Sequence, residues 1–300
     1  IKPKSKMFYM REGFAATSLS WIVISIVGAV PFVVTGCIPN PVDALFETVS
    51  GFTTTGASIL PAVEPLQHGV LFWRSFTHWI GGMGVLVFLL AIIPLSGGSN
   101  FNLMRAESPG PSVGKLVPKI RTTARLLYLI YLALTVMEFV FLVAGRMPVY
   151  DAICTSIGTA GTGGFGIKAD SMGGYSAYIQ WVVTIFMILF GVNFNAYYFI
   201  LYKKVKKALK LEEVRYYFLI ILVATGIIFM NLLQTSMGIW DSLRHAAFQV
   251  ATIITTTGYS TVDFNAWCQT SKTVLVLLMF VGACAGSTGG GIKVSRFVIL

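Results

Sequence analysis

The segment Gly51-Phe-Thr-Thr-Thr-Gly56-Ala-Ser has two counterparts further along the chain: Gly158-Thr-Ala-Gly-Thr-Gly163-Gly-Phe and Ile254-Thr-Thr-Thr-Gly258-Tyr-Ser. An aspartate precedes each segment, at positions 43, 151 and 241. It lies 13, 12 and 17 residues before Gly56, Gly163 and Gly258, so the third separation exceeds the first by about one helical turn. This threefold repetition predicts three copies of one structural unit.

Each copy has the composition of a short helix followed by a loop. An aspartate, about ten apolar and small residues and then a Thr/Gly run are typical of a helix with an aspartate N-cap that ends in an extended loop. Such a helix is too short to cross a bilayer, so it must enter and return. Irregular backbone is tolerated there only when it is buried in protein or lines a watery cavity, so three segments predict a shared cavity. A simple surface turn is the alternative for any single loop.

The composition places these loops in a membrane protein. Of the 300 residues, 55% are hydrophobic and 11% are charged, and the mean hydropathy is +0.76. Six apolar stretches are long enough to cross a bilayer as helices. They are residues 14–36, 75–95, 126–144, 176–202, 216–237 and 273–292. The sequence therefore predicts an all-α polytopic membrane protein of repeated helix, pore-loop, helix units around a central ion pore, as in K⁺ channels.

The net charge of +10 follows the connections between these stretches. Most lysines and arginines lie at the N-terminus, in 105–125, in 203–215 and at Lys293 and Arg296. These are alternate connections, so the positive-inside rule predicts a cytoplasmic N-terminus and loops that open to the outside. The pattern favours membrane topology over nucleic-acid binding. The basic cluster at 203–210 could also contact anionic lipid or a partner protein.

The predicted units favour a cation. A short helix that aims its C-terminus at the cavity directs the negative end of its dipole there. Glycine permits backbone angles that turn carbonyl oxygens inward, and threonine adds stiffness and a hydroxyl oxygen. Rings of such carbonyl oxygens replace the hydration shell of K⁺.

Several motifs resemble the Trk/Ktr superfamily of potassium transporters, and in particular its Trk-type membrane subunit. Besides the Thr-Thr-Thr-Gly loops they are Trp73-Arg-Ser-Phe-Thr-His-Trp-Ile-Gly-Gly-Met-Gly84, Arg105-Ala-Glu-Ser-Pro-Gly-Pro111, Gly191-Val-Asn-Phe194 and Gly282-Ala-Cys-Ala-Gly-Ser-Thr-Gly-Gly-Gly-Ile-Lys-Val294. The resemblance implies four non-identical pore repeats in the plasma membrane of a prokaryote. It also implies a homodimer, a cytosolic nucleotide-binding regulatory subunit of the RCK type, and K⁺ as transported ion without an organic cofactor.

The resemblance also assigns site residues. The K⁺ filter is expected at Thr54, Thr55, Gly56, Gly161, Thr162, Gly163, Thr256, Thr257 and Gly258. Four glycines, at 158, 161, 163 and 164, compete for alignment in the second loop. An intramembrane gate loop is expected at Gly286, Ser287, Thr288, Gly289, Gly290 and Gly291, where the glycines should unwind the last helix. A close helix-packing seam is the alternative for that cluster.

The expected organisation is a first repeat at 1–100, a cytoplasmic connection at 101–125, a second repeat at 126–210 and a third at 211–300. The family pattern has a fourth repeat, which is expected to be missing from this chain. Glu138 and His78 are ionisable residues in apolar stretches, for which snorkelling or a hydrogen bond to a neighbouring loop would suffice. Asn193 and Asn195 are expected to bond to the pore loops or to another helix, with support of the filter from behind as the favoured role.

Three other functions compete with K⁺ uptake. A Na⁺/K⁺ symporter of the same superfamily would lack a filter glycine, and all three loops keep one. A membrane-embedded enzyme would need a convergent catalytic or metal site, and the sequence has no Ser/His/Asp set or His-x-x-x-His pair. A non-conducting membrane sensor that kept the pore fold is not distinguished by sequence. The coupling ion, H⁺, Na⁺ or none, and the regulating nucleotide are also left open.

Overall fold

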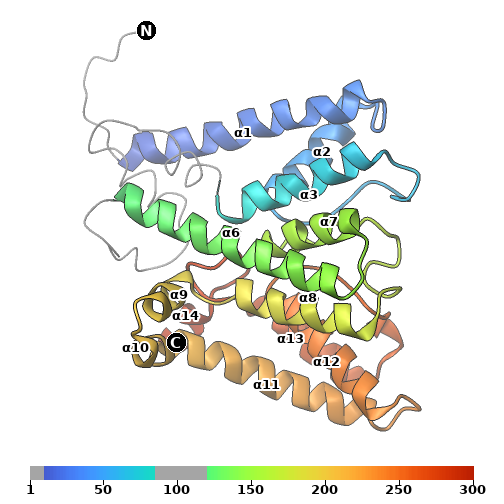
Figure 1. Cartoon of the computed structure of the whole chain (residues 1–300), viewed down its shortest axis with the longest axis vertical. Helices are drawn as coiled ribbons and strands as arrows, with labels where there is room; N and C mark the ends of the chain where they lie inside the picture. Colours follow the sequence, from blue (N-terminus) through green and yellow to red (C-terminus); the bar gives the residue numbers. More distant parts are fainter. Residues whose placement is uncertain (1–9, 85–119) are drawn as a thin grey trace.

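The computed structural model describes residues 10–84 and 120–300, and every helix in these ranges belongs to one of three similar units. Each unit has a long helix, a shorter helix, a loop and a returning helix. Figure 1 shows the units following one another in chain order from blue to red. Residues 101–119 of the predicted connection 101–125, and the stretch 85–95 of the second predicted span, lie outside the described residues.

The long helices are α1 (Met10–Val34), α6 (Ile120–Ala144) and α11 (Glu212–Leu232). Within them Phe14–Val34, Arg125–Ala144 and Glu212–Leu232 are long and apolar enough to cross a membrane. Buried and exposed apolar residues alternate around α11: Tyr217, Ile221 and Ile228 are buried, whereas Leu222 and Met230 are largely exposed. A helix that keeps apolar residues on its exposed side is suited to contact with lipid.

The shorter helices are α2 (Pro41–Phe52), α7 (Val149–Ala160) and α12 (Ile239–Ile254), and each packs against the long helix of its own unit. They have 12, 12 and 16 residues, which confirms the extra turn predicted for the third copy. The prediction of an aspartate N-cap is wrong. The caps are Asn40, Pro148 and Gly238, and each aspartate is the third residue of its helix, where its charge still complements the helix dipole.

The returning helices are less regular than the sequence suggests. They are α3 (His68–Gly82), α8 (Ala177–Phe190) with α9 (Phe194–Leu201), and α13 (Gln269–Phe280). The predicted span 176–202 is not one straight helix, because α8 and α9 meet at an angle of 92°. Short α10 (Val205–Leu209) leads from α9 to α11, and α14 (Val294–Ile299) follows the glycine-rich segment. A short 3₁₀ helix, η1 (Phe264–Ala266), precedes α13.

The units are joined by their short helices. The returning helix α3 of the first unit packs against α7 of the second, and α8 of the second packs against α12 of the third. The largest apolar core lies along α6, α7 and α8 and includes Tyr131, Leu142, Met187 and Phe190. Tyr259, which follows the third loop, is part of the same core. This packing fixes the ends of the three short helices close to one another.

Candidate ion-binding site

The three short helices end in the same hydrogen-bonded turn. In the first, the N–H groups of Thr53, Thr54 and Thr55 donate to the carbonyls of Val49, Gly51 and Ser50. The second repeats this pattern from positions 161, 162 and 163 to 157, 159 and 158. The third repeats it from 255, 256 and 257 to 251, 253 and 252. This is the Schellman motif, which satisfies the last carbonyls of a helix.

The residue that reverses the chain is a threonine in every loop. Thr54, Thr162 and Thr256 have φ angles of +55°, +52° and +57°. Glycine is the usual residue there, and a β-branched side chain at positive φ is a genuine outlier. Such strain costs roughly 1–3 kcal/mol at each position and persists only where the surroundings impose it. Because the same strained backbone occurs at three equivalent positions, it belongs to the structure that the three loops share, and it marks these loops as a candidate functional site.

The turn geometry also fixes which glycines correspond. Two residues after each strained threonine comes a glycine at positive φ, namely Gly56, Gly164 and Gly258. In the second loop the equivalent segment is therefore 162–164, one residue later than the predicted 161–163. The sequence held a signal for this register, because Gly164 lies 13 residues after Asp151, as Gly56 does after Asp43.

These glycines let the loops pack edge to edge in order. A Cβ atom on Gly56 would overlap the carbonyl oxygen of Gly163, and one on Gly164 would overlap the carbonyl oxygen of Thr257. Residues 163 and 257 are equivalent in the two turns, so both contacts have the same form. A Cβ atom on Gly258 would meet no atom of the described chain within 4 Å. The three loops thus form part of a ring whose open side is at Gly258.

His78 explains why the second loop departs from the Thr-Thr-Thr-Gly pattern. A Cβ atom on Gly161 would overlap the backbone carbonyl of His78, and one on Gly163 would overlap its imidazole ring. The imidazole is fully buried, stacks on Phe165 with ring centroids 4.1 Å apart, and accepts a hydrogen bond from the Phe165 N–H at 3.5 Å. The predicted hydrogen bond from His78 to a neighbouring loop is therefore confirmed.

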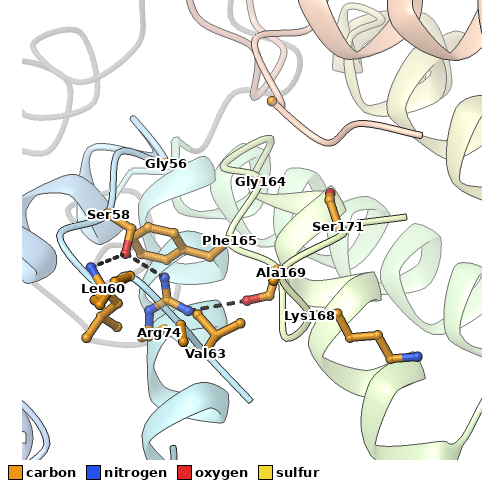
Figure 2. A pocket seen from close by; sticks show the side chains of 14 residues that line it. Gly56, Ser58, Leu60, Val63, Arg74, Gly164, Phe165, Lys168, Ala169 and Ser171 are labelled. Atoms are coloured by element: carbon orange, nitrogen blue, oxygen red, sulfur yellow. Dashed lines mark hydrogen bonds between the residues drawn. The ribbon is translucent and has the colours of Figure 1, made fainter. Parts of the chain in front are cut away.

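A pocket of about 270 Å³ opens beside the three equivalent glycines. Figure 2 shows Gly56 and Gly164 at its border and the side chains of Ser58, Arg74 and Phe165 along its wall. The rest of its lining comes from residues that follow the first two loops, among them Leu60, Val63, Lys168 and Ser171. The pocket lies where the three chain segments leave their turns, so it forms one mouth of the site.

A buried ion pair braces the first two loops. The Arg74 guanidinium donates from Nε to Glu47 Oε1 at 2.8 Å, and both side chains are almost completely buried. Arg74 also donates to Ser58 Oγ at 3.1 Å and to the Gly166 carbonyl at 3.3 Å, and it lies 4.2 Å above the Phe165 ring. Glu47 accepts from the Ile59 N–H at 3.1 Å. Sequence reasoning did not identify this pair, because the pairing depends on the fold.

The glycine-rich segment meets the other end of the loops. Helix α13 ends at Phe280 and α14 begins at Val294, which confirms the predicted break. The Thr162 hydroxyl donates to the Thr288 carbonyl at 3.0 Å, and the Gly290 N–H donates to Thr256 Oγ1 at 2.7 Å. The segment therefore contacts two of the three strained threonines directly. Thr162 and Thr256 precede the loop glycines Gly164 and Gly258, whereas the pocket is lined mainly by residues that follow the loop glycines.

The structure also shows where the other polar residues singled out in the apolar stretches lie. Glu138 is fully buried, so snorkelling is wrong for it, and neither carboxyl oxygen has a hydrogen-bond partner among the described residues. Asn193 lies at the α8–α9 break and caps α9 by accepting from the Asn195 N–H at 2.9 Å. Asn193 also donates to Glu213 of α11 at 3.2 Å beside the glycine-rich segment, which confirms a bond to another helix. Support of the filter loops from behind is therefore not the role of this Asn193 bond, and for Asn195 it stays a prediction.

Together, repeated half-length helices, strained loops and apolar long helices define an integral membrane protein of the pore-loop class. Residues 2–300 match the family described as TrkH, cation transport protein, and the chain belongs to that family. It is 35% identical to the Trk system potassium uptake protein TrkH of Halomonas elongata and 36% identical to that of Escherichia coli K12. Each match covers 97% of this chain and 61% of the relative.

A solved structure has the same fold. The crystal structure of the potassium transporter TrkH from Vibrio parahaemolyticus superposes with a TM-score of 0.84 at 32% sequence identity. The match covers 100% of this chain and 62% of that one. The chain thus spans about three fifths of the length of the proteins it matches.

Proposed function

We propose that the full-length protein takes up K⁺ across the plasma membrane through a filter formed by residues 54–56, 162–164 and 256–258. The observation that carries this proposal is the common backbone register of the three loops, with a strained threonine and a glycine at equivalent positions. The loops follow directly from the C-termini of α2, α7 and α12, whose dipoles favour a cation. The relatives are named potassium uptake proteins, which is consistent with K⁺ as the transported ion.

We propose that segment 286–291 is the gate of this pathway. Its hydrogen bonds to Thr162 and Thr256 support a position next to the filter loops, at the end opposite the pocket. Glycines permit the segment to change its backbone angles with little steric cost. Broken helices in the middle of a membrane are a frequent location of ion pathways.

We further propose that the N-terminus and segment 203–210 face the cytoplasm, so that the pocket opens to the outside. Lys203, Lys204, Lys206 and Lys207 are exposed and can contact anionic lipid or a cytosolic nucleotide-binding subunit of the RCK type. The protein is expected to form a homodimer. Light scattering of the purified complex tests the stoichiometry, and cross-linking at these lysines tests the contact.

Uptake of radioactive Rb⁺ into proteoliposomes containing the full-length protein tests the proposed function. Excess K⁺ should block the uptake of Rb⁺, whereas the same excess of Na⁺ should not. Gly258→Ser should abolish uptake or admit Na⁺, because a side chain at a φ of +90° distorts the third loop. Gly226→Ser is the matched control, because a Cβ at this α11 position meets no atom of another described element within 4 Å. Na⁺-dependent uptake would indicate a symporter, and K⁺ binding without flux would indicate a sensor.

A further inference from the structure

The glycine-rich segment is held at its base by one carboxylate. Glu213, in the first turn of α11, accepts hydrogen bonds on Oε1 from the N–H of Ala285 and, at 3.2 Å, from the N–H of Ser295. These two N–H groups lie on either side of segment 286–291. A single side chain from another element therefore joins the two ends of the segment.

The same carboxylate reaches the break between α8 and α9. Its Oε2 accepts from Asn193 Nδ2 at 3.2 Å. At this break the Gly191 carbonyl accepts from the Cys284 N–H and the Phe194 N–H donates to the Gly286 carbonyl, each at 3.0 Å. The start of the glycine-rich segment is thus fixed to the α8–α9 break, and Glu213 bonds to both.

Glu213 is suited to hold this segment firmly and reversibly. Hydrogen bonds to an ionised acceptor are roughly twice as strong as neutral ones. Other bonds also hold the segment: the hydroxyls of Thr162 and Thr256 bond to it at its filter end, the Thr288 hydroxyl donates to the Phe190 carbonyl, and the Lys293 ammonium donates to the Gly289 carbonyl. Among the described residues, Glu213 is the α11 side chain that hydrogen-bonds on both sides of the segment, and α11 follows the basic residues at 203–210.

We infer that Glu213 is the latch of the gate: its carboxylate keeps segment 286–291 against the filter loops, and its release lets the segment move away. This inference rests on the proposed function for the role of the segment in conduction. It makes Glu213 a positioning residue, which acts through the backbone of the segment and does not contact the ion. A movement of 203–210 would reach the gate through the first turn of α11.

Hydrogen exchange of the full-length protein in nanodiscs tests the latch without requiring conduction. In Glu213→Ala, amides of peptides covering 284–295 should exchange about tenfold faster, which corresponds to about 1.4 kcal/mol of lost protection. Glu213→Gln keeps the shape of the side chain and should give an intermediate rate. Glu212→Gln is the matched control, because Glu212 is the exposed neighbour in the same turn and should leave exchange unchanged.

Rb⁺ uptake normalised to folded protein completes the test. Release of the latch should raise uptake in Glu213→Ala at least several-fold while the preference for K⁺ over Na⁺ is kept. Loss of structure alone would lower uptake, so an increase separates gating from folding. Unchanged exchange, or faster exchange with unchanged or lower uptake, overturns the latch. A wild-type protein that passes no Rb⁺ refutes the proposed function instead, and exchange still decides whether Glu213 holds the segment.

Discussion

The imidazole of His78 occupies the space that a side chain at Gly163 would need. His78 comes from the returning helix of the first unit, whereas Gly163 belongs to the loop of the second. Thr55 and Thr257, the equivalents of Gly163 in the other loops, carry side chains. The second loop therefore has glycine where the other two loops have threonine, and the His78 side chain occupies the space that the threonine side chain would need. Its different sequence reflects packing behind the loop and leaves its backbone unchanged.

Gly163→Ala should destabilise the protein through this overlap. Overpacking of a buried site costs typically about 1–3 kcal/mol, and a thermal-shift measurement in detergent should show a lower Tm. His78→Ala combined with Gly163→Ala should recover part of the loss, since the second change makes room for the first. Gly69→Ala is the control, because a Cβ there meets no atom within 4 Å. Strictly additive effects of the two changes would refute the proposed overlap.

Breaking the buried ion pair should be more damaging. Glu47→Gln leaves the Arg74 guanidinium buried without a counter-charge, and such a change costs about 3–5 kcal/mol. The variant should show a strongly lowered Tm and reduced Rb⁺ uptake, because Arg74 also bonds to Ser58 and Gly166 beside the filter loops. Glu212→Gln is the comparison at an exposed carboxylate and should change Tm little. Equal Tm values for the two variants would contradict the bracing role.

His245 in α12 should make stability depend on pH. Burial, and then the neighbouring Arg244, lower the pKa of His245 below its usual value, and Nδ1 lies 2.9 Å from the Thr261 hydroxyl. The unfolded chain therefore binds more protons below about pH 6.5, so stability is present above that pH and is lost as the pH falls toward the folded-state pKa. His245→Gln should flatten the dependence of Tm on pH between about 7 and 5. A wild-type Tm that does not change across this range would contradict the assignment.

The register of the second loop has its own test. Gly164→Ser should reduce discrimination between K⁺ and Na⁺ by on the order of tenfold, equivalent to about 1.4 kcal/mol, because it distorts the loop next to Thr257. Gly166→Ser lies outside the equivalent segment and its φ is not in the left-handed region, so selectivity should be kept. Competition of Na⁺ against Rb⁺ uptake measures both. Lost selectivity in Gly166→Ser with normal selectivity in Gly164→Ser would overturn the register.

The repeated pattern was enough to predict the main architecture. The alternation of long apolar stretches with Asp-led segments predicts the three units, and the longer third spacing predicts the extra turn of α12. The bend between α8 and α9 was missed because the run 176–202 carries no charged residue and is mostly apolar, although Gly191 and Asn193 mark the break. The pairing of Arg74 with Glu47, and the position of His78 behind the second loop, depend on contacts between units. No local pattern in the sequence encodes such contacts.

The central claim is that residues 54–56, 162–164 and 256–258 hold the transported ion. Crystals of the full-length protein grown with Tl⁺ in place of K⁺ test it directly, through the anomalous difference density of the bound ion. The account predicts a peak enclosed by the main-chain carbonyl oxygens of all three segments, lost when K⁺ replaces Tl⁺ and kept when Na⁺ is added in excess beside Tl⁺. Density confined to other parts of the protein, or a peak within the three segments that Na⁺ displaces as readily as K⁺ does, would contradict it.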